Sequence, residues 1–228
     1  MKFMWAPCWL GDDGRFLPRH TKWLNWNLPL LGRMDLDAIV LFDNASPIDE
    51  LKKLQGTIYD ESFNVPIFQG ASRRLHILRY KEFLPRISHL NYPYVYRAFQ
   101  GQDLVIKHFN ASKSVYLDTD YFVLSNKCLD FIKNTNNGWV STYSQIHKFP
   151  ESSFSILNKD HFNAYRLWSH TSWDHFENQC FETLIPFSEI NKELNGDRWG
   201  ELVPPKPLEQ GMDFYGQTLP DFDIKWIG

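Results

Sequence analysis

The feature that most constrains the fold of this chain is an apolar run in its middle, from Ser114 to Leu124, that carries two aspartates. β-Branched, aromatic and aliphatic residues precede Asp118, and this composition predicts a short strand buried on both faces. Asp118 and Asp120 stand one residue apart where that strand ends, and we expect the chain to turn there. In open α/β sheets, ligands bind at the carboxyl ends of parallel strands. The run therefore predicts a ligand site at one edge of a buried sheet.

The Asp118-Thr119-Asp120 pattern indicates a divalent metal. Carboxylate oxygens are hard ligands that suit Mg²⁺ or Mn²⁺, and these ions in turn suit a diphosphate. The alternative is an acidic turn that closes a strand and binds nothing, which is common in α/β proteins.

The rest of the chain alternates between the two kinds of secondary structure. Further strands are expected over residues 3–9, 37–42, 65–68, 139–143, 154–157 and 222–227. Helices are expected over residues 21–31, 48–54, 73–87, 94–109, 128–133, 159–168 and 209–217. Strands that alternate with helices through the first 140 residues favour an α/β fold: a single, mostly parallel, Rossmann-like sheet with helices on both faces.

Composition excludes several classes of protein. A hydrophobic content of 43% with 22% charged residues is typical of a globular chain. The formal net charge of −3 provides no electrostatic footprint for nucleic acid or for a membrane surface. Three widely spaced cysteines form neither a disulfide framework nor a zinc cluster, so we expect a reducing, cytoplasmic location. We also expect no transmembrane segment, because the sequence lacks a long apolar run.

Three segments together resemble the nucleotide-sugar-dependent glycosyltransferases of the A-type fold. They are a first strand that ends in Pro7-Cys8-Trp9, a second strand with Leu41-Phe42-Asp43-Asn44-Ala45-Ser46, and Val115-Tyr116-Leu117-Asp118-Thr119-Asp120. The resemblance implies one glycosyltransferase domain over residues 1–228, with 1–125 binding the nucleotide sugar and 126–228 binding the acceptor. It also implies metal-dependent transfer of a sugar from a nucleotide-sugar donor, a UDP-sugar, to a hydroxyl of a glycan or another acceptor.

The resemblance gives roles to four residues of the donor site. Asp120 would bind Mn²⁺ or Mg²⁺ directly, and Asp118 would contact the ribose or a metal-bound water. Asp43 would accept a hydrogen bond from the base, usually uracil, and Trp9 would lie beside that base. The alternative for Asp43 is a cap that closes its own turn.

A helix just before the aspartate motif supplies weaker candidates. By resemblance, Asp103 and Lys107 would face the donor sugar, although a solvated helix face accounts for the same residues. Arg73, Arg74 and Arg97 are further candidates for contact with the diphosphate.

Inverting members of this fold need a general base for the acceptor hydroxyl. By resemblance, Glu209 or Asp213 would serve, although Gln210 replaces the second acid that is common there. The alternatives are an exposed helix start, or a retaining reaction that uses no such base. A histidine can also complete the metal shell in some relatives, and the candidates in the second half of the chain are His147, His161, His170 and His175.

Two other functions are compatible with the sequence. In haloacid-dehalogenase-type phosphatases an Asp-x-Asp motif also follows an apolar strand, and there Asp118 would be the nucleophile and Asp120 the general acid. A non-catalytic carbohydrate-binding module would account for the nine tryptophans. Metal-dependent hydrolysis of a UDP-sugar separates the transferase from both.

Overall fold

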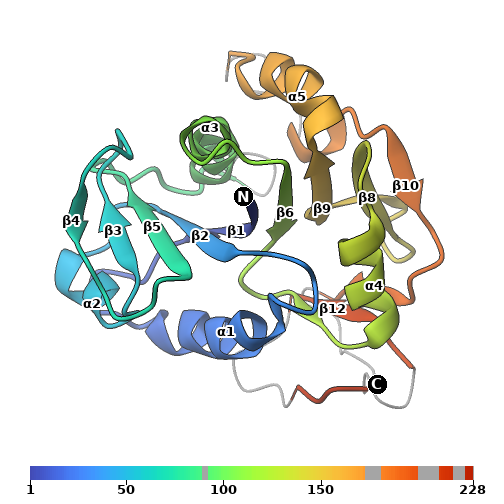
Figure 1. Ribbon diagram of the computed structural model, residues 1–228, viewed down its shortest axis with the longest axis horizontal. Helices are drawn as coiled ribbons and strands as arrows, with labels where there is room; N and C mark the ends of the chain where they lie inside the picture. Colours follow the sequence, from blue (N-terminus) through green and yellow to red (C-terminus); the bar gives the residue numbers. More distant parts are fainter. Residues whose placement is uncertain (89–91, 173–180, 200–210, 218–223, 228) are drawn as a thin grey trace.

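The computed structural model describes residues 1–88, 92–172, 181–199, 211–217 and 224–227 (Figure 1). Within these residues the strands are β1 (Lys2–Cys8), β2 (Ala38–Asp43), β3 (Thr57–Tyr59), β4 (Pro66–Phe68), β5 (Leu75–Arg79), β6 (Lys113–Leu117), β7 (Phe122–Val123), β8 (Trp139–Ser144), β9 (Phe149–Asn158), β10 (Glu189–Asn191), β11 (Gly196–Arg198) and β12 (Phe214–Gly216). The helices are α1 (Leu17–Leu30), α2 (Ile48–Lys52), α3 (Pro93–His108), α4 (Asn126–Asn134) and α5 (Phe162–Ser169), with 3₁₀ turns η1 (Lys159–His161) and η3 (Phe181–Leu184).

A nine-stranded sheet in the order β10-β8-β9-β6-β1-β2-β5-β3-β4 forms the centre of the described fold. The run from β6 through β1, β2 and β5 to β3 is parallel, and β9 is antiparallel to both of its neighbours. The predicted α/β class with a mostly parallel sheet is confirmed. Because β1 and β6 are adjacent and parallel, their carboxyl ends lie at the same edge of the sheet.

The central strands bury both faces, as the apolar run around Asp118 predicts. On β1, Met4 and Ala6 pack into a core on one side of the sheet, whereas Phe3 and Trp5 pack into a core on the other. This alternation follows from the two-residue period of a strand. Helices α1 and α4 cover the first side, and α3 and α5 cover the second (Figure 1).

Aromatic rings fix the contact between β1 and β6. The Trp5 ring stacks on Tyr116 at a centroid distance of 4.2 Å. Phe42 and Phe99 make T-shaped contacts with Trp5, at centroid distances of 5.4 and 4.9 Å. Offset and edge-to-face aromatic pairs contribute beyond their buried area. The residues just before the two aspartates are therefore held in a rigid part of the core.

A second, smaller sheet joins the carboxyl-terminal part of the chain to the region after β6. It has the order β11-β12-β7, with β11 parallel to β12 and β12 antiparallel to β7. This sheet brings Arg198, at the end of β11, close to the aspartate motif, as described below.

Two predicted helices are wrong. Residues 73–87 contain β5, whose Leu75 and Ile77 pack into the core beside β2; pairing with a buried parallel strand overrides the helical charge pattern. At the carboxyl end, residues 214–216 form β12, and residues 209 and 210 lie outside the described part of the chain. The strand predicted over 222–227 falls largely on residues that are not described.

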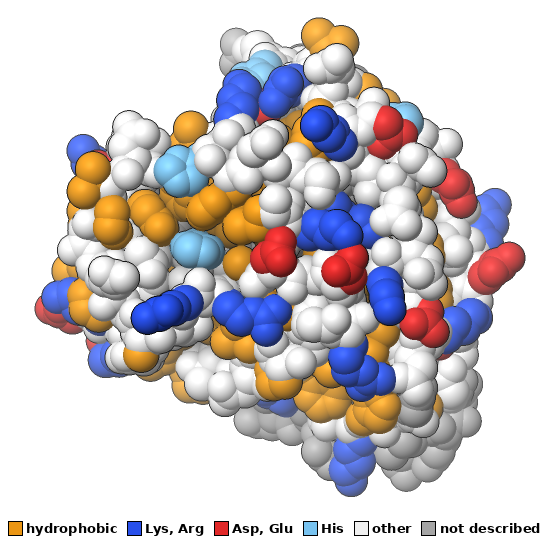
Figure 2. All heavy atoms as spheres, viewed as in Figure 1, with side chains coloured by type: hydrophobic (Ala, Val, Ile, Leu, Met, Phe, Trp, Pro, Cys, Tyr) orange, Lys and Arg blue, Asp and Glu red, His pale blue; other side chains and the backbone are white. Residues whose placement is uncertain are grey.

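The longest described helix, α3, has 16 residues. Among the described residues, every helix is too short or too polar to cross a bilayer. On the face shown in Figure 2, acidic side chains are interspersed among basic ones.

Candidate active site

A cleft of about 440 Å³ lies at the carboxyl ends of β1 and β6. Its volume is within the range of small-molecule sites. The end of β1 and the turn after β6 form its floor, and α1, the segment after β5, the start of α3, β9 and β11 contribute its walls. The lining residues used below are Trp9, Phe16, Arg19, Asn44, Phe83, Leu84, Arg86, Asp118, Asp120, Ser153 and Arg198.

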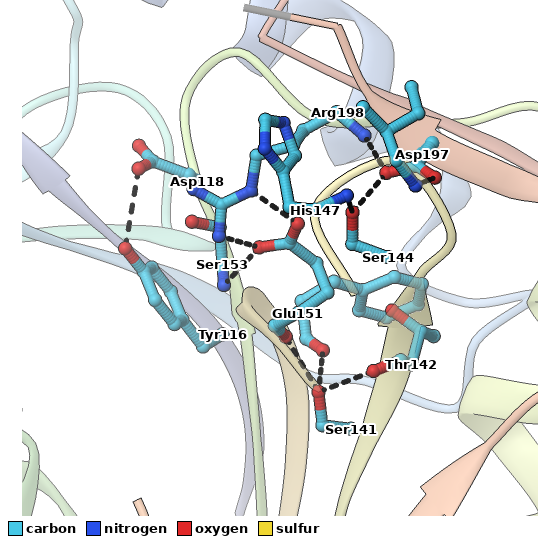
Figure 3. Close-up of polar contacts among 12 residues, drawn as sticks. Tyr116, Asp118, Ser141, Thr142, Ser144, His147, Glu151, Ser153, Asp197 and Arg198 are labelled. Atoms are coloured by element: carbon cyan, nitrogen blue, oxygen red, sulfur yellow. Dashed lines mark hydrogen bonds and ion pairs between the residues drawn. The ribbon is translucent and has the colours of Figure 1, made fainter. Parts of the chain in front are cut away.

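A tight turn brings both aspartates into this cleft. The Asp118 backbone N–H donates to Ser153 O at 3.1 Å, and the Tyr121 N–H donates back to Asp118 O at 2.9 Å. The Asp118 carboxylate accepts a hydrogen bond from the Thr119 N–H at 2.6 Å. It also accepts one from the Tyr116 hydroxyl at 3.3 Å (Figure 3). The expectation that both acids face one site agrees with this geometry.

Within the described part of the chain, the Asp120 carboxylate has a hydrogen-bond partner at one of its oxygens but not at the other. Arg19 Nη2 donates to Asp120 Oδ2 at 2.8 Å. Asp120 Oδ1 is buried and has no hydrogen-bond partner among the described residues. Burial, together with the nearby charge of Asp118, raises the pKa of Asp120 to about 7, although Arg19 and Arg198 oppose this shift. The site would therefore be stabilised by a further positive charge.

These observations fit a divalent cation that shares its coordination with a substrate. Mg²⁺ is commonly held by one or two carboxylates together with substrate phosphates. Asp118 and Asp120 would supply the carboxylates. Oδ1 of Asp120, which has no hydrogen-bond partner among the described residues, would be one of the metal ligands. The described residues contain no group of three His, Cys, Asp or Glu side chains arranged for a metal, so the remaining ligands would come from substrate and water.

A second arginine enters the cleft from β11. Glu151 accepts from Arg198 Nε at 2.6 Å through Oε2 and from Nη2 at 2.7 Å through Oε1 (Figure 3). Glu151 Oε1 also accepts the Ser153 N–H at 3.0 Å. The Arg198 guanidinium lies over the Phe149 ring, 5.0 Å from its centroid. Arg198 is therefore a fixed positive charge beside the two aspartates.

Aromatic side chains also line the cleft. The Trp9 ring lies 5.3 Å from Phe16 and 5.1 Å from Phe83, measured between centroids. The guanidinium of Arg15 lies over Trp9 and Phe16, at 5.6 and 5.2 Å from their centroids. Trp9 thus lines the cleft, and its surroundings suit a flat, partly apolar group.

Asn44 fixes the chain segment that carries Phe83. Its amide donates to Leu84 O at 2.8 Å and accepts from the Leu84 N–H at 3.0 Å. Arg97 Nη2 donates to Asn44 Oδ1 and to Glu82 O. Arg97 therefore supports this wall from behind and is not among the lining residues of the cleft.

Asp43 differs from its expected role. Its carboxylate is fully buried and accepts from the N–H of Ser46 at 2.9 Å and from the Ser46 hydroxyl. Burial raises the pKa of Asp43 to about 6, against the effect of these hydrogen bonds. Asp43 is not among the lining residues of the cleft. The structure agrees with the alternative, a side chain that closes its own turn.

Asp103 also lies away from the cleft. Its side chain is 2% exposed and pairs with Lys107, Arg166 and His170, which joins α3 to α5. Burial alone would raise the pKa of Asp103, but the three partners hold it below its ordinary value. Lys107 takes part in the same cluster. Neither residue is among the lining residues that would face a donor sugar.

Two other arginine candidates are not among the lining residues either. Arg74 donates to the carbonyl oxygens of Leu36 and Asp37, before β2 begins, at the amino edge of the sheet. Arg73 is exposed next to it.

The structure places Asp213 inside the protein. The Ser125 hydroxyl donates to Asp213 Oδ1 at 2.6 Å, and the Asn195 N–H donates to Oδ2 at 2.8 Å. Lys127 Nζ lies 3.4 Å from Oδ2. These contacts tie α4 to the second sheet and leave Asp213 out of the cleft lining, contrary to its expected part in catalysis. Glu209 lies outside the described residues, as does His175.

The arginines that line the cleft are not predicted from the sequence. Arg19 lies in the first turns of α1, where Pro18 near the helix start is a signal that the helix begins before Thr21. Arg86 follows β5 in a segment for which the sequence predicts a helix. Arg198 and Glu151 have no local signal, because the contact between them joins residues 47 positions apart.

No protein-family model and no curated protein matches this chain. Its fold is similar to solved structures of the galactosyltransferase LgtC. One of them, in complex with donor and acceptor sugar analogs, matches with a TM-score of 0.59 at 8% identity over 96% of this chain and 88% of that chain. An active-site mutant of LgtC matches with a TM-score of 0.57 at 8% identity over 95% and 86%. At this level of identity the likeness shows the fold alone, which is the expected glycosyltransferase A-type fold.

Proposed function

We propose that this protein is a metal-dependent glycosyltransferase that moves a sugar from a nucleotide-sugar donor, a UDP-sugar, to a hydroxyl group of a glycan or another acceptor. The observation that carries the proposal is the pair Asp118 and Asp120 at the end of β6, with the buried Asp120 Oδ1 lacking a hydrogen-bond partner among the described residues. The likeness of the fold to LgtC supports the same function.

The residues of the cleft divide into two groups that match the two parts of such a donor. Trp9, Phe16 and Phe83 provide rings against which a nucleobase can pack. Arg19 and Arg198 provide positive charge near the two aspartates, where a diphosphate would lie. The sugar would then extend from the diphosphate toward the acceptor-binding half of the chain, residues 126–228.

Transfer breaks the bond between the anomeric carbon and the diphosphate oxygen and forms a bond from that carbon to the acceptor oxygen. The chemistry that Mn²⁺ or Mg²⁺ supplies at Asp118 and Asp120 is Lewis-acid stabilisation of the charge on the departing diphosphate. Arg19 and Arg198 add electrostatic stabilisation at the same place. The acceptor proton passes to a base, for which Glu209 stays a candidate.

Turnover of a panel of nucleotide sugars in the presence of Mn²⁺ tests the proposal. The release of a nucleoside diphosphate from at least one donor is expected from the wild type and not from Asp120→Asn. Asp49→Asn is a matched control, because Asp49 is an exposed partner of Lys52 on α2. Hydrolysis of simple phosphate esters without donor turnover would instead support the phosphatase, and absence of nucleotide binding would support a non-catalytic module.

A further inference from the structure

We propose that Glu151 is a positioning residue that holds the Arg198 guanidinium in the place where it binds the donor diphosphate. Glu151 itself does not contact the substrate; it acts through Arg198. This inference rests on the proposed function, because it assigns Glu151 a role in the part of the same cleft that would bind the donor diphosphate. It also goes beyond that function, because diphosphate binding then depends on the Glu151 carboxylate, which is not part of the aspartate motif.

The geometry of the pair fixes both the position and the plane of the guanidinium. Both Glu151 oxygens accept from Arg198, at 2.6 and 2.7 Å, and the Phe149 ring lies against the guanidinium. The guanidinium group has five N–H donors in a planar fork, and Glu151 accepts two of them. A planar cation held in this way suits the oxygens of a phosphate group.

The position of Arg198 relative to the aspartates indicates what it binds. Arg198, Asp118 and Asp120 all line the same cleft. A diphosphate bridging to a cation at Asp118 and Asp120 would therefore lie within reach of Arg198. The Arg198 side chain is only 11% exposed, so solvent screens its charge weakly.

Strand β9 holds this pair at the edge of the cleft. Its pairing with β8 changes register between Ser141 and Thr142, which leaves residues 152–154 of β9 as a bulge. Glu151 stands at the start of the bulge and binds the N–H of Ser153, and Ser153 O accepts from Asp118. Bulges often direct side chains next to active sites. Glu151 thus joins Arg198 to the backbone that positions the aspartate motif.

The cost of burying the pair argues for a use beyond stability. Glu151 is 1% exposed, and desolvation of a buried ion pair can exceed the gain from its attraction. Apolar residues of similar size would join β9 to β11 at least as well. Anion binding explains why a cation is kept here and why a carboxylate fixes it.

The test is a double-mutant cycle on ligand binding, measured by isothermal titration calorimetry. The variants are Arg198→Lys, Glu151→Gln and both together, and the probes are UDP with Mn²⁺, inorganic pyrophosphate with Mn²⁺, and uridine. Lysine retains the charge and the packing over Phe149, and glutamine retains the shape of Glu151, so thermal melting can identify the folded variants. Ser188→Ala, a change at a partly exposed contact of Trp139, is the control.

We expect each single variant to bind UDP and pyrophosphate about tenfold more weakly, with uridine unchanged, because a bidentate, charge-assisted contact is lost. The double variant should be no weaker than Arg198→Lys alone, since Glu151 acts through Arg198. A Glu151→Gln variant that binds UDP as well as the wild type, or more tightly, would overturn the inference even if it melts at a lower temperature. So would fully additive losses.

These outcomes separate the inference from the proposed function. Diphosphate binding that depends on Arg198 and Glu151, with no donor turned over, would support the positioning role and reject the transferase. Donor turnover with unchanged diphosphate affinity in the variants would reject the positioning role alone. A wild-type protein that binds neither UDP nor pyrophosphate would reject both.

Discussion

Arg19 Nη2 lies 2.8 Å from Asp120 Oδ2, so a cation on helix α1 already contacts the carboxylate that we assign to the metal site. The pair joins α1 to the turn after β6. It also leaves the other oxygen, Oδ1, without a partner among the described residues. The arginine therefore compensates part of the charge of Asp120 and leaves room for a further cation.

Competition between Arg19 and the metal gives the first prediction. In Arg19→Gln, the affinity for Mn²⁺ without nucleotide should rise about threefold to fivefold, the size expected for a partly exposed ion pair. Titration followed by Mn²⁺ electron paramagnetic resonance measures this affinity. Lys52→Gln, which removes a partly exposed lysine on α2, is the control and should leave it unchanged. Unaltered Mn²⁺ affinity in Arg19→Gln would show that the two cations do not share Asp120.

The second prediction concerns the stability cost of Asp120. Burial raises the pKa of Asp120 to about 7, so the folded protein binds a proton at this carboxyl more readily than the unfolded chain does. The stability that comes from this proton is lost as the pH rises from about 4 through 7. At pH 8, Asp120→Asn should therefore melt at a higher temperature than the wild type while losing turnover. The difference should shrink at pH 5. A variant that melts lower at pH 8 would contradict this account of the site.

The third prediction concerns His20, which is buried in α1 beside Arg19. Burial lowers its pKa to about 4, and its Nδ1–H donates to Phe16 O at 2.8 Å. Because the unfolded chain binds the proton more readily, stability from this group is complete above pH 6.5 and is lost as the pH falls toward 4. The loss at pH 5 is about 2 kcal/mol. Chemical denaturation of His20→Gln at pH 7 and pH 5 should show a smaller drop than the wild type, whereas exposed His147→Gln should show the same drop.

The fourth prediction assigns a structural role to Asp103. Asp103→Asn should lower the free energy of unfolding by about 2 kcal/mol, because a buried carboxylate with cationic partners on α3 and α5 is replaced by a neutral group. Turnover by the folded variant should be close to that of the wild type. Lys107→Gln should cost less, since Lys107 is 58% exposed. A large loss of turnover in stable Asp103→Asn would return this residue to the donor site.

The parts of the site that the sequence predicts are those encoded by local pattern. The strand before Asp118 is an unbroken apolar run, and the two aspartates that follow it bring carboxylates to the edge of the sheet. Trp9 follows β1 in the same way. Asp43 is harder to assign, because a turn cap and a base ligand occupy the same place at the end of a strand, and only the contacts with Ser46 distinguish them.

The remaining parts depend on contacts between distant segments. Glu151 and Arg198 meet because the fold brings β9 and β11 together at the cleft, and neither residue has a neighbour in sequence that signals this. The same holds for Asp213, whose partners Ser125 and Asn195 determine that it is structural. A helix is predicted wrongly over 73–87 because the burial of Leu75 and Ile77 in a parallel sheet is a tertiary effect.

The most direct test of the account is a crystal structure of the protein with UDP and Mn²⁺, with the metal located by its anomalous scattering. The account predicts one manganese peak contacted by Asp120, with Asp118 beside it, diphosphate oxygens on the same ion and the base against Trp9. A diphosphate bound elsewhere, or bound in the cleft with both carboxylates directed away from the metal, would contradict it.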